Sequence, residues 1–129
     1  MVDTDLGFSD EVPCDRSFIL ALTDAVNVVS GKWKLAIVCV LLIGPKGFNE
    51  IERMLERISP RMLSRELREL ELNGVVERRE GQGTKGRHGR LYALTPSGEG
   101  LKDVVVMMTR WGHRHRRLQT ASSSPDPAP

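Results

Sequence analysis

One segment of the chain, residues 59–74 (SPRMLSRELRELELNG), constrains the fold most, because its two ends and its buried face follow from the residues alone. Serine is a favoured N-cap residue, and a proline at the first helical position loses no hydrogen bond there. Asn73-Gly74 is a typical helix end. Three leucines follow one another at spacings of four and three, so they share one face of a helix: Leu63, Leu67 and Leu70. The segment predicts an amphipathic helix over residues 59–73.

The opposite face of this predicted helix carries side chains that suit phosphate oxygens and guanine edges: Arg61, Ser64, Arg65 and Arg68. A shorter predicted helix, residues 49–56, precedes it after a brief turn, and the two together form a helix-turn-helix. The first turns of the second helix would then enter the major groove of DNA. Because Glu66, Glu69 and Glu71 share the helix, a solvated face with intrahelical ion pairs is the alternative.

The glycine-rich stretch GQGTKGRHGR, residues 81–90, begins with the G-x-G-x-x-G spacing of many phosphate-binding loops. A dinucleotide site needs a helix after that loop. Here a strand is predicted on each side, residues 75–80 and 90–95, so the loop joins a β-hairpin. A Walker A loop would need Lys followed by Ser or Thr where Arg87-His88 stand.

The tip of the hairpin is basic instead, through Lys85, Arg87, His88 and Arg90. Such a tip predicts contact with a nucleic acid backbone, and a solvated basic loop is the alternative.

Three further helices complete the expected fold, which is mainly α with a small β part (α+β). Residues 17–29 have helical apolar spacing, residues 32–43 predict a buried central helix, and a last helix is expected over residues 97–117. With 129 residues, we expect one domain over residues 14–117. An acidic, flexible arm is expected at residues 1–13 and a disordered Ser/Pro-rich tail at residues 118–129.

The net charge of +2 is distributed unevenly along the chain. Residues 1–15 contain acids and no Lys or Arg, whereas all 19 Lys and Arg lie within residues 16–117. A basic body of this kind favours a polyanionic partner. The longest apolar run, residues 35–43, is far below the ~20 residues of a membrane helix, and no signal peptide is visible. Together with only two cysteines, these features predict a cytoplasmic protein.

In five successive segments the chain is similar to the HxlR-type winged helix-turn-helix transcriptional regulators of bacteria: SGKWKLAIVCVLL, GPKGFNEIERML, ISPRMLSRELRELELNGVVER, LYALTPSGEGL and RWG. The resemblance covers residues 30–112. It implies a homodimer that binds a pseudo-palindromic operator in double-stranded DNA, most often as a repressor. The helix over residues 59–73 would contact the major groove, the two-stranded hairpin would be the wing, and the terminal helices would form the dimer.

Carried onto this chain, the resemblance places five residues at the DNA face: Ser59, Pro60, Arg61, Ser64 and Arg65. Lys32 and Lys34 would add contacts to the DNA backbone. Two departures stand out. Glu66 occupies a position where the family more often has Arg or another polar residue, and the wing carries glycines in place of prolines. A dimeric scaffold that has lost DNA binding is therefore one alternative, and a small nucleotide-binding protein is the other.

Cys14 is the candidate redox sensor. Many members of the family have a thiol-sensing cysteine at a fixed distance before the GKW tryptophan, but that position is Leu20 here and Cys14 lies further upstream. A reactive thiolate needs positive neighbours, whereas acids surround Cys14, so an inert cysteine is the alternative. Cys39 lies within an apolar helix and is expected to be packed and inert. An oxidant or a small molecule is the expected signal.

The sequence predicts no catalytic, metal or cofactor site. His113 and His115 are two residues apart, a spacing that does not place them on one face of a helix. No paired carboxylates or Cys–His pair stand in a shared context, so we do not expect an enzyme.

Overall fold

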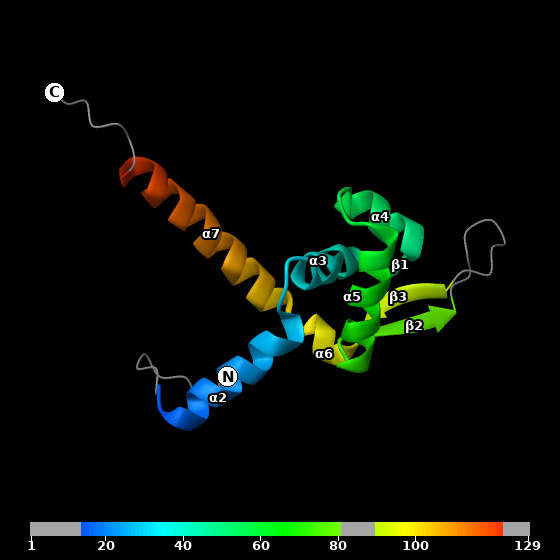
Figure 1. Ribbon diagram of the computed structural model, residues 1–129, viewed down its shortest axis with the longest axis horizontal. Helices are drawn as coiled ribbons and strands as arrows, with labels where there is room; N and C mark the ends of the chain where they lie inside the picture. The colour runs from blue at the N-terminus through cyan, green and yellow to red at the C-terminus, as the bar shows by residue number, and fades with distance from the viewer. Residues whose placement is uncertain (1–13, 81–89, 123–129) are drawn as a thin grey trace. The chain divides into compact units, whose positions relative to one another are not determined.

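The computed structural model of the protein describes residues 14–80 and 90–122, in two units that divide between Ser30 and Gly31. The first unit contains one described helix, α2 (Arg16–Val29), at the blue end of the chain in Figure 1. It begins at Asp15, whose Oδ1 accepts a hydrogen bond from the Phe18 N–H at 2.8 Å. None of the residues of α2 is buried. Among the helices that the structure describes, none is by itself long and apolar enough to cross a membrane.

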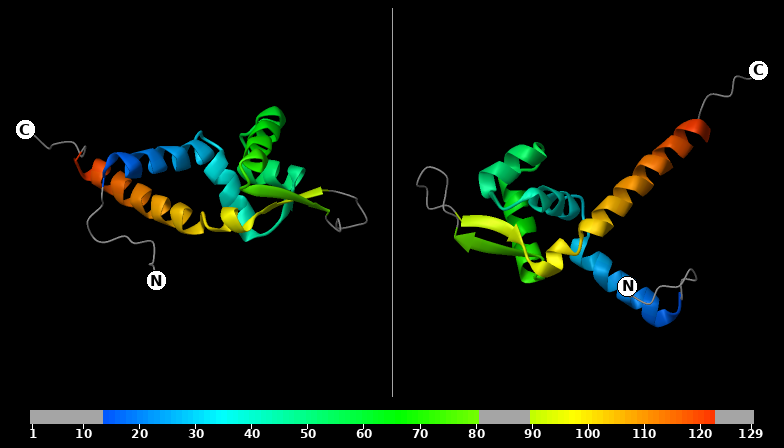
Figure 2. Two further views of the ribbon diagram at one scale, coloured as in Figure 1. Left: turned by 90° about the horizontal axis from the view of Figure 1, so that it is seen from below. Right: turned by 180° about the vertical axis from the view of Figure 1, so that it is seen from behind.

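The second unit has a helix-turn-helix followed by a wing. In chain order the elements are α3 (Lys34–Ile43), β1 (Lys46–Gly47), α4 (Phe48–Leu55), α5 (Pro60–Leu72), β2 (Val76–Glu80), β3 (Arg90–Leu94), α6 (Pro96–Glu99) and α7 (Lys102–Ser122). Figures 1 and 2 show α3, α4 and α5 gathered beside a small sheet. The long helix α7 is the last element of the chain.

The core of this unit lies between α3, α4, α5 and the sheet. Its fully buried side chains come from all three helices: Ile37, Val38, Leu41, Ile51, Leu63, Leu67 and Leu70. The predicted leucine face of α5 is therefore confirmed, and the predicted central helix α3 is buried on one face only. Burying large aliphatic side chains stabilises a fold by about 1.5–3 kcal/mol each, so this shared core fixes α5 against α3.

The sheet is antiparallel and has the strand order β1-β3-β2. β2 and β3 pair from Val76 opposite Leu94 to Glu80 opposite Arg90, which confirms the predicted hairpin. The third strand, β1, was not predicted. It is only two residues long and pairs Lys46 with Tyr92, so it is too short to leave an alternating pattern in the sequence.

The single C-terminal helix predicted over residues 97–117 was wrong at both ends. The chain forms the short α6 first, and α7 starts after Leu101. Thr95 caps α6 by accepting a hydrogen bond from the Gly98 N–H at 3.0 Å. At its other end α7 continues to Ser122, so residues 118–122, which were assigned to the disordered tail, are helical. Leu, Gln and Ala in this stretch are compatible with a helix.

Candidate nucleic-acid interface

The turn between α4 and α5 sets where the second helix begins. Glu56 follows α4 with a positive φ of 66°, which turns the chain out of the helix. Ser59 then caps α5, because its Oγ accepts a hydrogen bond from the Met62 N–H at 3.1 Å. Pro60 is the first helical residue, as predicted. Ser59, Pro60 and Arg61 are all exposed.

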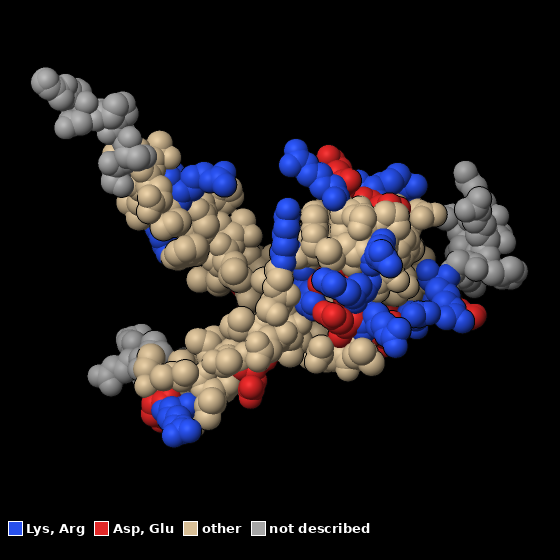
Figure 3. Space-filling view, viewed as in Figure 1, with Lys and Arg blue, Asp and Glu red and all other residues tan. Residues whose placement is uncertain are grey.

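The next turns of α5 present the predicted polar face to the surface. Ser64, Arg65 and Arg68 are exposed together with Arg61, on the side opposite the buried leucines. Figure 3 shows Lys and Arg side chains gathered over the part of the molecule that α4, α5 and the wing strands form, with a few acidic side chains among them. The residues therefore share one accessible, basic face, and their contact with DNA stays a prediction.

Lys34 and Glu66 lie inside the protein instead of at its surface. They are buried at 6% and 5% exposure, and the Lys34 Nζ lies 2.7 Å from the Glu66 Oε1. The same Nζ lies 2.6 Å from the Oε1 of Glu69. The suggestion that Lys34 contacts the DNA backbone was therefore wrong, because its charge is bound within the core. Glu66 is likewise not part of the exposed face of α5. It therefore gives no reason to favour the alternative of a scaffold that has lost DNA binding.

The charges of this cluster stabilise one another. Burial alone lowers the pKa of Lys34, but its hydrogen bonds to Glu66 and Glu69 outweigh burial and raise that pKa above the usual 10.5. The hydrogen bond from Lys34 also lowers the pKa of Glu69 below its usual 4.5. A buried charge is tolerated only when it is paired in this way, so Lys34 connects α3 to two positions of α5.

Arg65 borders the same cluster from the solvent side. Its Nη2 lies 3.5 Å from the Glu66 Oε2, the oxygen that Lys34 leaves free, and 3.5 Å from the Met62 Sδ. The side chain is 64% exposed. The distance to the Glu66 oxygen is long for an ion pair, so Glu66 holds Arg65 only weakly next to the surface that α5 presents.

Two arginines at the base of the wing were not predicted as site residues. Arg78 and Arg79 are exposed on β2. The Arg78 Nε lies 3.1 Å from a carboxylate oxygen of Glu71 on α5, and its guanidinium is 5.8 Å from the centre of the Tyr92 ring. The consecutive bases of VERRE were the only available signal, and a sequence alone does not place them beside α5.

The other predicted wing residues are only partly covered by the structure. Arg90 begins β3 opposite Glu80 and is exposed. Lys85, Arg87 and His88 lie outside the described residues. Lys32, just before α3, is exposed, and its Nζ lies 5.0 Å from the centre of the Trp33 ring.

Both cysteines are exposed. Cys14, the candidate sensor, precedes the cap of α2. Cys39 was expected to be packed and inert, and the expectation of packing was wrong. The face of α3 that bears it turns away from the core and shares a shallow pocket with α7, lined by Leu35, Ala36, Cys39, Val105, Met108 and Thr109. Within residues 14–80 and 90–122, no group of three or more His, Cys, Asp or Glu could hold a metal ion.

Comparison with known proteins agrees with this geometry. The family model for the HxlR-like helix-turn-helix matches residues 28–120. A helix-turn-helix transcriptional regulator of Methanothermobacter thermautotrophicus is 32% identical over 121 residues, which cover 94% of this chain and 91% of the relative. The regulator YodB of Bacillus subtilis is 36% identical over 70% of this chain and 79% of its own. Both relatives are helix-turn-helix transcriptional regulators.

Solved structures give the same result. The redox regulator HypR in its reduced form superposes with a TM-score of 0.69 at 33% identity, covering 78% of this chain and 98% of HypR. Quinone-bound YodB superposes with a TM-score of 0.63 at 33% identity, covering 74% of this chain and 98% of YodB. With its helix-turn-helix, its wing and these relatives, the chain belongs to the HxlR-like helix-turn-helix family of DNA-binding transcriptional regulators.

Proposed function

We propose that the protein acts as a homodimeric repressor, with α5 in the major groove of a pseudo-palindromic operator and the wing on the flanking DNA. The observation that carries the proposal is the division of α5 into two faces. On one face Leu63, Leu67 and Leu70 are buried to 1% exposure or less. The opposite face has exposed polar side chains: Arg61, Ser64, Arg65 and Arg68. A helix fixed by one face and basic on the other suits insertion into a groove.

The exposed residues divide into two roles. Arg61 and Arg65 are the candidates for bidentate contacts to guanine, which distinguish one base pair from another. Ser59, Ser64 and Arg68 suit phosphate oxygens, and the first helical turn at Pro60 would approach the backbone. On the wing, Lys85, Arg87, His88 and Arg90 would add phosphate contacts, as would Lys32 before α3. Phosphate contacts position the protein and carry no sequence information directly.

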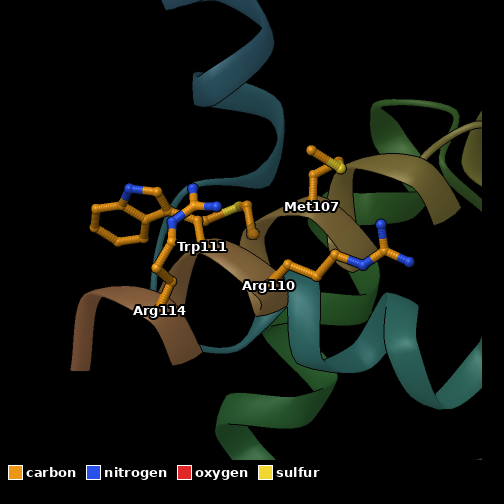
Figure 4. A pocket seen from close by; sticks show the side chains of 5 residues that line it. Met107, Arg110, Trp111 and Arg114 are labelled. Carbon is orange, nitrogen blue, oxygen red and sulfur yellow. The ribbon is translucent and has the colours of Figure 1, made fainter. Parts of the chain in front are cut away.

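The proposed dimer is supported by large apolar side chains that stay exposed in the described part of the chain. On α7 they recur at helical spacing along one face, and all are more than one third exposed: Val104, Met107, Met108, Trp111 and Leu118. Figure 4 shows Met107, Arg110, Trp111 and Arg114 around a pocket on this helix. On α2, Ile19, Leu22 and Val26 are about half exposed with the same periodicity. Faces of this kind are typical of protein–protein contacts.

Repression follows from position, because a dimer bound across a promoter excludes the polymerase from the same DNA. Such a protein works in the cytoplasm, where bacterial DNA lies. An oxidant is the proposed signal, with Cys14 as the thiol that receives it. Two observations support this part of the proposal: Cys14 is exposed, and the chain is similar to HypR, a redox regulator with a reduced and an oxidised form.

The test is selection of duplexes from a random library by the purified full-length protein, with binding of the enriched duplex measured at several salt concentrations. We expect two half-sites whose centres lie about one helical turn, or a multiple of it, apart. Arg61→Ala should relax the preference at one base position by about 1–3 kcal/mol. Neutralising Lys85 and Arg87 should weaken binding to all sequences and flatten its salt dependence. Arg116→Ala, away from the DNA face on α7, is the matched control.

Absence of any enriched sequence over competitor DNA, even at low salt, would refute the proposal and favour a scaffold without DNA binding. The redox part is tested separately, by repeating the binding measurement with hydrogen peroxide. Release of DNA by the unmodified protein and by Cys39→Ser, but not by Cys14→Ser, is the expected result. Equal release by all three would rule out Cys14 as the sensing thiol.

A further inference from the structure

The exposed Arg65 and the buried Lys34 lie next to the same carboxylate. Lys34 binds the Oε1 of Glu66 at 2.7 Å, and Arg65 approaches its Oε2 at 3.5 Å. The two cations differ in their surroundings, because the Lys34 side chain is 8% exposed and the Arg65 side chain is 64% exposed. Glu66 is therefore shared between a cation of the core and a cation of the proposed DNA face.

The surroundings decide which cation Glu66 holds. An exposed ion pair in water contributes little, and the 3.5 Å distance to Arg65 is long. A short pair shielded from solvent is screened far less, and it satisfies a carboxylate that would be costly to bury alone. As long as Lys34 is present, its ammonium neutralises the Glu66 carboxylate. The guanidinium of Arg65 can then turn towards a phosphate or a base.

We propose that Lys34 is a positioning residue for DNA binding: it neutralises the buried Glu66 carboxylate, so that Arg65 remains available to the DNA. The inference rests on the proposed function, in which Arg65 contacts DNA. Without Lys34, the buried carboxylate has Arg65 as its remaining neighbouring cation within 4 Å among the described residues. Arg65 then pairs with Glu66, and DNA has to compete with a buried charge for it.

The experiment measures the equilibrium affinity of full-length variants for the duplex enriched in the selection described above. Methionine is long and unbranched like lysine but carries no charge, so Lys34→Met removes the ammonium and keeps much of the side-chain volume. We expect Arg65→Ala and Lys34→Met each to weaken binding by about tenfold, within the range of one lost base contact. Lys34→Met combined with Arg65→Ala should bind no more weakly than either variant alone, since both changes remove the same contact.

Rescue separates positioning from mere support of the fold. Adding Glu66→Gln to Lys34→Met removes the charge that captures Arg65, so affinity should return to within about threefold of the unmodified protein. A purely structural role predicts that affinity stays low in this double variant, and that result overturns the inference. Additive losses for Lys34→Met and Arg65→Ala overturn it as well. Lys102→Met, an exposed lysine at the start of α7, is the matched control.

If Lys34→Met fails to fold, Glu66→Gln alone decides the question. In that variant Lys34 keeps Glu69 at 2.6 Å as a partner, and the carboxylate that lies 3.5 Å from Arg65 is replaced by an uncharged amide. Affinity equal to or tighter than that of the unmodified protein supports the inference, and weaker binding overturns it. Arg65→Ala separates the DNA contact of Arg65 from the positioning role of Lys34. Unchanged affinity in Arg65→Ala refutes the role of Arg65 in the proposed function, whereas a loss in Arg65→Ala without rescue by Glu66→Gln refutes only the role of Lys34.

Discussion

Gly98 in α6 packs directly against the backbone that enters the wing. A Cβ added there would collide with the carbonyl oxygen of Val75 and would lie 3.1 Å from the Leu94 Cδ2. Real Cβ atoms essentially never approach other heavy atoms within 3.0 Å, and the nearest atom here belongs to the backbone. Gly98→Ala therefore requires α6 to move away from the chain that leads into β2.

The cost can be worked out from the contacts at this point. Overpacking a tight interior site costs typically about 1–3 kcal/mol. The Val75 oxygen also accepts hydrogen bonds from the Thr95 N–H at 3.0 Å and the Thr95 hydroxyl at 3.2 Å, and moving α6 strains both. With about 1 kcal/mol for a hydrogen bond, the expected loss in free energy of unfolding is about 3 kcal/mol. For a domain of this size, that lowers the melting temperature by about 12–24 °C.

The assay is urea unfolding followed by far-UV circular dichroism, with all variants at one protein concentration because a dimer's stability depends on it. Gly112→Ala in α7 is the matched control. Its added Cβ meets nothing within 4 Å among the residues that the structure describes, and alanine is favoured over glycine inside a helix by about 0.5–1 kcal/mol. An unfolding midpoint for Gly98→Ala equal to that of the unmodified protein would refute the close approach of α6 to Val75.

Three further predictions concern the cap, the ion cluster and the dimer. Ser59→Ala removes the cap of α5 and should cost about 1 kcal/mol in urea unfolding, with loss of DNA affinity in the same variant; unchanged stability would mean that the cap contributes nothing. Because the pKa of Glu69 is lowered in the folded protein, its contribution to stability is present above the usual value of 4.5 and disappears as the pH falls through the lowered value. Urea unfolding between about pH 3 and 6 should therefore be less pH-dependent in Glu69→Gln, and an identical pH profile would contradict the hydrogen bond from Lys34. Met107→Glu places a charge on the apolar face of α7 and should shift the mass measured by light scattering towards the monomer, whereas an undisturbed dimer would place the interface elsewhere.

The parts of the fold that could be predicted from the sequence are those with a repeating pattern. The leucines of α5 recur at helical spacing over several turns, and Ser59-Pro60 and Asn73 mark its ends. β1 has no such signal, because two residues cannot show a period. The predicted end of α7 was too early, because the polar composition of the tail begins near residue 118 while the helix continues to Ser122.

The site was predictable only as far as side chains obey their usual preference for water. Arg61, Ser64 and Arg68 lie where their polarity suggests. Lys34 and Glu66 are buried although they are charged, because they pair with each other across 32 positions of the chain. No local sequence pattern reveals such a pair. The prediction for Cys39 was wrong in the opposite direction. Its apolar neighbours in the sequence predicted that it is buried, but Cys39 is exposed because the described chain covers only part of α3.

The strand order β1-β3-β2 leaves β2 at an edge of the sheet, where unpaired backbone groups could join a strand of another molecule. β2 reads VERRE, so four of its five side chains carry a charge of either sign. Charged side chains on an edge strand discourage pairing with further strands. The opposite side of β3 is occupied by the two residues of β1. The charged side chains of β2, the outer strand of the wing, thereby protect the wing against aggregation through edge-to-edge strand pairing.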